Sequence, residues 1–95
     1  MNLWWLTCRA LKGMFPDELA VLVATAEGRS LSLFASSKFI RLKDRRLEDL
    51  DGEEVEAQMR VELLDQDDRF GLVQFPAQPL DGPRIAKVER QLLSA

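Results

Sequence analysis

Apolar and polar residues alternate without interruption from Val55 to Leu63. This period of two places one set of side chains on a dry face of a strand and the other set on a wet face. On a helix the same spacing would scatter the apolar side chains around the axis, and no single stripe could bury them. The pattern therefore predicts a β-strand over residues 55–63, with its odd-numbered positions in the core.

Two hairpins are expected around this strand. Aspartates in residues 64–69 separate the strand from a second β-type run, Phe70 to Phe75, and such turn residues between two runs indicate a hairpin. Upstream, Leu19 to Ala26 has the length and composition of a strand, although in isolation it could also be a buried helix capped by Asp17. The alternating run 30–33 follows directly after Gly28, which favours two strands joined at that glycine.

The ends of the chain give weaker patterns. Even positions from Trp4 to Ala10 are apolar, which predicts a first strand with Trp5 pointing outward. Three prolines in residues 76–83 predict an irregular linker. Residues 84–93 fit helical spacing as well as alternation, and we favour a strand at 84–89 ending in one helical turn. In the middle, Ser36-Ser37 suggests a bulge or kink before a further strand in which Phe39, Ile40 and Leu42 interleave with basic residues.

Five to seven short strands in 95 residues predict a mainly β fold, a small antiparallel barrel or sandwich formed by one domain over residues 1–95, with a short C-terminal helix as the open alternative. The size and strand count are those of SH3-like or OB-like barrels. This likeness concerns architecture alone, because the sequence carries no family motif.

Composition narrows the cellular setting. Hydrophobic residues make up 46% and charged residues 31% of the chain, as in ordinary globular proteins, and no apolar run approaches the length needed to span a bilayer. The apolar residues at 3–6 run straight into Thr7-Cys8-Arg9, unlike a signal peptide. The single cysteine cannot form an intramolecular disulfide. We therefore expect a cytoplasmic protein.

The residue types exclude several kinds of chemistry. The chain has no histidine and one cysteine, so a zinc site and a histidine-dependent nucleophilic triad are excluded. Asp17-Glu18 is typical of a turn and not of a catalytic carboxylate pair. The acidic segment around Gly52 does not match an EF-hand calcium loop, because the ligand positions one and twelve of the loop would be Leu47 and Gln58. The glycines are too scattered for a phosphate-binding loop. We expect no enzyme activity, no metal and no cofactor.

Charge is unevenly distributed along the chain, whose formal net charge is −3. Five bases lie within nine residues and are followed by an acidic run over 48–56. Two solvated surfaces of opposite charge that neutralise each other would explain this pattern. A binding patch for an anionic partner such as single-stranded nucleic acid would also explain it, but the overall acidity of the chain opposes this second interpretation. The candidate patch is Lys38, Arg41, Lys43, Arg45 and Arg46.

The other candidate surface is the segment 13–18, which connects the first two expected strands. Met14 and Phe15 either fold back to plug one end of the barrel or, with an outward Trp5, form an apolar interface. We expect a binding module for another protein or for a copy of itself. The alternative is an accessory domain for RNA or single-stranded nucleic acid that uses the 38–46 basic segment, and carboxylate-based catalysis is a distant third.

Overall fold

The protein folds into an antiparallel β-structure with eight strands and three single turns of 3-10 helix, as described by a computed structural model that covers residues 1–95. The 3-10 turns are η1 (Ser37–Phe39), η2 (Leu47–Asp49) and η3 (Arg90–Leu92). The strands are β1 (Leu3–Lys12), β2 (Glu18–Ala24), β3 (Ser30–Ser36), β4 (Ile40–Leu42), β5 (Val55–Gln66), β6 (Phe70–Gln74), β7 (Ile85–Glu89) and β8 (Leu93–Ser94).

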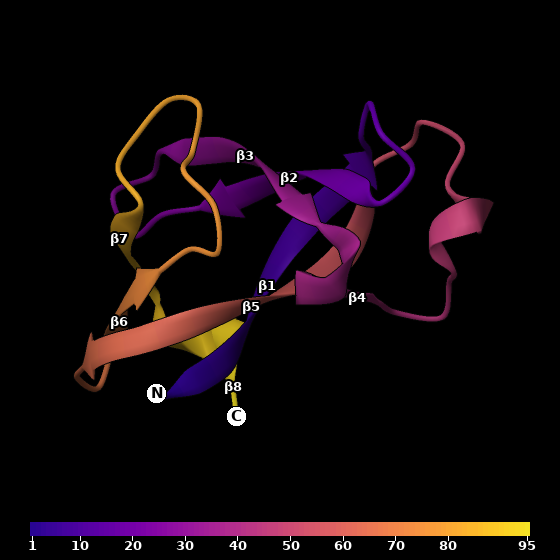
Figure 1. The fold of residues 1–95 in the computed structure, drawn as a ribbon. Coiled ribbons are helices and arrows are strands. Elements are labelled where there is room, and N and C mark those ends of the chain that lie inside the picture. The colour runs from indigo at the N-terminus through magenta and orange to yellow at the C-terminus, as the bar shows by residue number, and fades with distance from the viewer.

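The strands form a single curled sheet, a half-barrel, with the order β3-β2-β1-β5-β6-β7 (Figure 1). The short strands β4 and β8 lie off this path, where β4 pairs with β5 and β8 pairs with β1. The longest ladder joins β1 to β5 and runs from the pair Leu3–Glu62 to the pair Ala10–Val55. These two strands cross the middle of the molecule, and the other strands are arranged around them (Figure 1).

The predicted mainly β antiparallel fold is confirmed. In β5 all five odd positions from Val55 to Leu63 are buried, and the intervening positions are exposed or half-buried. β5 continues to Gln66, three residues further than the alternation indicated, and the register against β6 shifts between Leu63 and Asp65. After the shift Asp65 lies opposite the exposed Leu72 and not on the core face, which explains why the alternation stops there.

Other expectations are confirmed in type and adjusted in detail. Residues 19–26 contribute strand β2 and not a helix. The chain after Pro83 forms β7, followed by the single turn η3. The two-residue strand β8 is an eighth strand, one more than the expected maximum of seven. Of the two alternatives at Ser36-Ser37, the kink is confirmed and the bulge is wrong. β3 ends at Ser36, and the turn η1 redirects the chain into β4.

The turns follow from their residues. Gly28 adopts a φ of 78° in the β2–β3 turn, a conformation that side chains with a Cβ disfavour. In the β5–β6 turn, the Asp67 carboxylate accepts hydrogen bonds from the backbone N–H groups of Arg69 and Phe70, each at 2.8 Å. These two bonds stabilise the charged form and lower the pKa of Asp67.

The core is wholly apolar and lies on the concave side of the sheet. It comprises 18 buried residues and contains no buried polar or charged residue. The inward positions of β1 are Leu6, Cys8 and Ala10, with Trp4 packed against the same cluster, as the parity of β1 predicted. Burial of this continuous apolar surface is the main force that keeps the sheet curled.

The proline-rich linker covers one edge of the sheet. The backbone N–H of Leu80 donates to the carbonyl of Ser32 in β3 at 2.7 Å, and the Asp81 carboxylate accepts from the N–H of Ser32 at 2.9 Å. The N–H of Ala26 donates to the carbonyl of Lys87 at 2.9 Å, which ties the β2–β3 turn to β7. The outward backbone groups of Ser32 at the β3 edge are thereby satisfied within the chain.

None of the helical turns has the length or apolar character that spanning a membrane would require.

Truncation of a core side chain tests the parity of β5. Met59 is fully buried, so Met59→Ala should lower the free energy of unfolding by about 2–5 kcal/mol through lost burial and a residual cavity. Glu56→Ala, on the exposed face of the same strand, should change it by less than about 0.5 kcal/mol. Denaturant titration followed by circular dichroism measures both values, and equal losses would contradict the register.

Candidate interaction surfaces

Met14 and Phe15 occupy the turn between β1 and β2 and point into solvent. Their exposed fractions are 82% and 64%. The fold-back alternative, in which both residues plug one end of the barrel, is therefore wrong. We call the segment 13–18 the tip.

The backbone of the tip is fixed by hydrogen bonds. The N–H of Gly13 donates to the carbonyl of Glu18, and the N–H of Glu18 donates to the carbonyl of Phe15, each at 3.1 Å. The N–H of Ser37 donates to the carbonyl of Asp17 at 2.7 Å and ties the tip to the chain after β3. A Cβ on Gly13 would lie 2.6 Å from the Glu18 carbonyl oxygen, so this close approach requires glycine. The two apolar side chains thus project from an ordered turn.

Trp5 lies on the outer face of the sheet, in contact with two arginines. The guanidinium carbons of Arg41 and Arg60 are each 4.2 Å from the centre of the Trp5 ring. Arg60 is directly opposite Trp5 in the β1–β5 ladder, whereas Arg41 belongs to β4 and pairs in register with Gln58. The distances are those of cation–π contacts, which stabilise the charged guanidinium groups over the aromatic ring.

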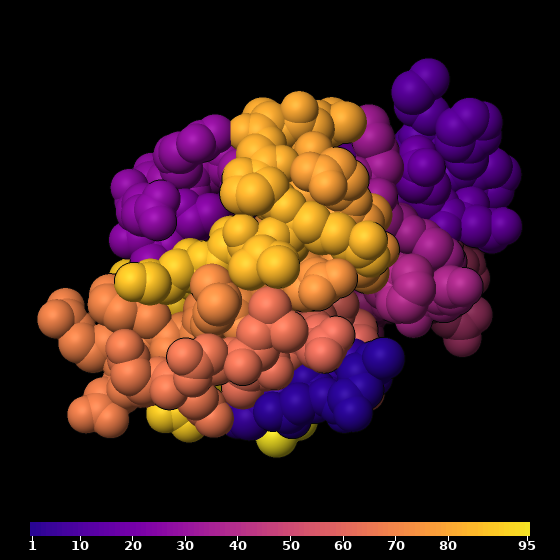
Figure 2. All heavy atoms as spheres, turned by 60° about the vertical axis from the view of Figure 1, so that its left-hand side comes forward, coloured from indigo at the N-terminus to yellow at the C-terminus, as the bar shows by residue number.

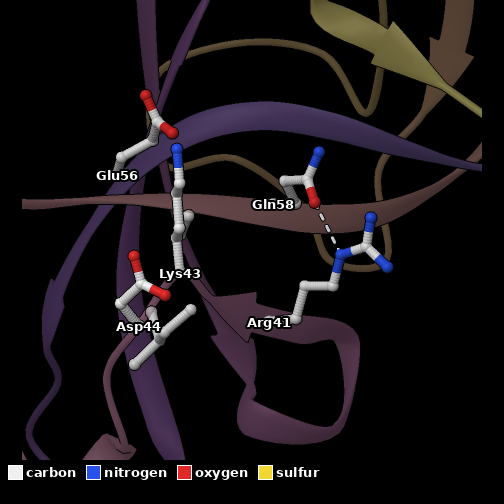
Figure 3. A pocket seen from close by; sticks show the side chains of 7 residues that line it. Arg41, Lys43, Asp44, Glu56 and Gln58 are labelled. Atoms are coloured by element: carbon white, nitrogen blue, oxygen red, sulfur yellow. Dashed lines mark hydrogen bonds between the residues drawn. The ribbon is translucent and has the colours of Figure 1, made fainter.

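Neither of these arginines is neutralised by a carboxylate. The ion pairs of the chain are Arg9–Glu54, at 3.1 Å, and Arg45–Glu53. The Nε atom of Arg41 donates to the side-chain oxygen of Gln58, and its two terminal nitrogens point away from that contact (Figure 3). The outer face therefore holds two adjacent positive charges that no acidic side chain pairs with.

Trp5 and the tip do not form the single apolar patch expected for Trp5, Met14 and Phe15. β1 continues for seven residues beyond Trp5 before the tip begins. At about 3.3 Å per residue this distance is roughly 23 Å. The two features lie toward opposite ends of β1 (Figure 1).

The basic segment is divided among several local contacts. Lys38 lies over the ring of Phe39 at 5.2 Å, and Arg45 pairs with Glu53 in the acidic run. The backbone N–H of Arg46 donates to the Asp49 carboxylate at 3.4 Å. Part of the positive charge of this segment is therefore offset by the neighbouring acids.

A shallow polar groove of about 490 Å³ lies along β4 and β5, between Arg41 and Asp44 on one side and Glu56 and Gln58 on the other. Lys43 extends across it toward Glu56 (Figure 3). Bases and acids alternate around this groove, so its charge is mixed.

A second groove, of about 330 Å³, lies beside the N-terminus and is the more apolar of the two. Figure 2 shows the N-terminal residues against β5 on this side of the molecule. Leu3, Phe39 and Pro76 contribute apolar surface, and Arg60 and Glu62 of β5 contribute charge. Sequence patterns did not reveal this groove, because its walls come from five separated segments. The outward parity of Leu3 was the only local signal.

No group of three or more His, Cys, Asp or Glu side chains is arranged so that it could hold a metal ion. The acidic segment around Gly52 forms an exposed loop.

Comparison with protein-family models, with curated proteins and with solved structures finds no match to this chain.

Cys8 offers a chemical test of the packing of β1. Burial leaves it 5% exposed and raises the pKa of its thiol to about 12. Below that pH the thiol stays protonated and shielded, so native protein should react with a thiol reagent at about pH 8 far more slowly than denatured protein. Absorbance during reaction with Ellman's reagent measures both rates. Equal rates would contradict the burial of Cys8.

Proposed function

We propose that this protein is a non-catalytic interaction module that contacts a partner protein through the tip. One observation carries the proposal, namely that Met14 and Phe15 are 82% and 64% exposed on a turn whose backbone is hydrogen-bonded. Large apolar side chains are costly to leave in water, and methionine and aromatic residues are enriched where proteins associate. Because the turn is already ordered, binding would lose little backbone entropy.

The tip would act as the anchor of a larger contact. A stable interface requires about 1,000 Å² or more of buried surface, which two side chains cannot supply alone. Lys12 and Asp17 flank the two apolar residues and are exposed, so they are suited to a polar rim. The proposed module is of SH3-like size and acts in the cytoplasm, where its single buried cysteine would remain reduced.

Photo-crosslinking tests this proposal directly. A benzophenone amino acid at position 15 should give discrete crosslinked products with another polypeptide chain when the protein is irradiated in native lysate, because Phe15 would be buried in the partner. The matched control places the same group at Leu80, which is 69% exposed on a different loop. Mass spectrometry identifies the products. A pattern at position 15 no different from that at position 80 would refute the proposal.

A second candidate function, binding of single-stranded nucleic acid, is favoured by the contacts of Arg41 and Arg60 with Trp5. Arginine and aromatic side chains together are the groups on which unpaired bases stack. The formal net charge of −3 and the acids beside Lys43 weigh against a long phosphate backbone on this face. Protein binding through the tip therefore remains the primary proposal.

Salt dependence distinguishes the two candidates. If nucleic acid is the ligand, a fluorescent oligothymidine or oligouridine should bind, and its affinity should fall steeply with salt because counterions are released. Arg41→Glu with Arg60→Glu should abolish that binding, whereas Met14→Ser with Phe15→Ser should preserve it. Fluorescence anisotropy measures the affinities. Absence of binding at low salt would eliminate this candidate.

A further inference from the structure

We infer that the tip of one copy of this chain docks into the apolar groove beside Arg60 of a second copy. This inference rests on the proposed function of the tip and names the partner. Both surfaces are present on the same chain. The tip projects from the molecule and the groove is concave, and the two carry opposite charges.

The apolar part of the match joins Phe15 to the groove. Phe15 and Met14 project from a turn, and the groove of about 330 Å³ is a concave site of the size that can accept such side chains. Its apolar lining includes Leu3, which is 44% exposed, together with Phe39 and Pro76. Docking would remove apolar surface from water on both copies, which is the main source of affinity at such contacts.

The charged part of the match joins Asp17 to Arg60. Asp17 is exposed two residues after Phe15, and its side chain forms no hydrogen bond or ion pair within the chain. Arg60 lines the groove and has no acidic partner. Arg84 also lines it and donates to the backbone carbonyls of Phe75 and Pro76, so its charge is not neutralised either. Glu62 is the one carboxylate in the lining, which leaves the groove positive.

The positions of the two surfaces suit a symmetric pair. The tip follows the end of β1, and the groove lies beside its beginning, at Leu3. When two elongated molecules lie antiparallel, each can place its tip at the groove end of the other. The same contact is then made twice around a two-fold axis, as in most homodimers, and the assembly closes without forming open chains.

Two other grooves were compared with the groove beside Arg60, and one of them supplies a control. The groove along β4 and β5 is polar and of mixed charge. A groove of about 260 Å³ near Ile85 carries Arg29 and Lys87 with Glu27 and thus resembles the Arg60 groove in charge. Lys87 therefore serves as the matched control for Arg60 in the experiment.

Sedimentation velocity of the purified chain tests the inference. We expect a reversible dimer over roughly a hundredfold range of concentration. Asp17→Arg and Arg60→Glu should each weaken dimerisation by at least about tenfold, because each places like charges together at both contacts. Lys87→Glu should leave the dimer unchanged. Circular dichroism confirms that the variants remain folded.

Mixing the two weakened variants gives the sharpest readout. A chain with Asp17→Arg has a positive tip and a positive groove, whereas a chain with Arg60→Glu has a negative tip and a weakened or reversed groove charge. Each homodimer is then repulsive, but the mixed dimer pairs opposite charges at both contacts. Equimolar mixing should restore dimers to near the wild-type level, and failure of the mixture to associate would overturn the inference.

Two further outcomes would also overturn it. One is a wild-type chain that stays monomeric at every concentration, and the other is a dimer that Lys87→Glu disrupts and Arg60→Glu does not. In either case the proposed function is judged separately by the crosslinking at position 15. Crosslinks there to a different protein would preserve the proposed function while the self-docking inference fails, and absence of any crosslink would refute both.

Discussion

The pairing of β5 on both of its edges is the constraint on which the rest of the structure depends. β1 pairs along one edge from Val55 to Glu62, and β4 and β6 share the other edge. A strand held on both sides cannot slip by one residue without moving its apolar set to the wrong face. The alternation in β5 therefore fixes the inward face of β1, and through β1 it fixes the faces of β2 and β3.

The same pairing creates the outer surface that carries the candidate chemistry. Because Met59 and Val61 must point inward, Arg60 must point outward, directly opposite Trp5. The pairing of β4 with β5 then brings Arg41 to the same ring. The contact between Trp5 and the two arginines is thus a consequence of the register that buries the core, and it could not be moved without unpacking that core.

The sequence predicted the strand faces and the turns, which depend on the local spacing of residues. It did not predict which side chains meet on the surface, because that depends on distances along and across the sheet. Alternation was sufficient to place Val55 to Leu63 and Trp4 to Ala10 on their faces, and turn residues located both hairpins. Parity says which face Trp5 occupies but not how far along β1 it lies from Phe15, so the expected common patch was wrong. Parity also cannot show that Leu3, Phe39 and Pro76 meet, since η1 and the linker reach the groove through the curl of the sheet.

The edges of the half-barrel explain why the tip is the prominent apolar feature. An exposed strand edge would itself invite association, but Leu80 and Asp81 satisfy the polar groups of Ser32 in β3, and Ala26 contacts β7 through the carbonyl of Lys87. With those sites occupied by the chain itself, association through strand addition is disfavoured there. Met14 and Phe15, in contrast, are exposed side chains on the hydrogen-bonded backbone of the tip. The groove beside Arg60 combines apolar surface with positive charge that no acidic side chain pairs with, and the proposed docking would place it against Phe15 and Asp17 of the tip.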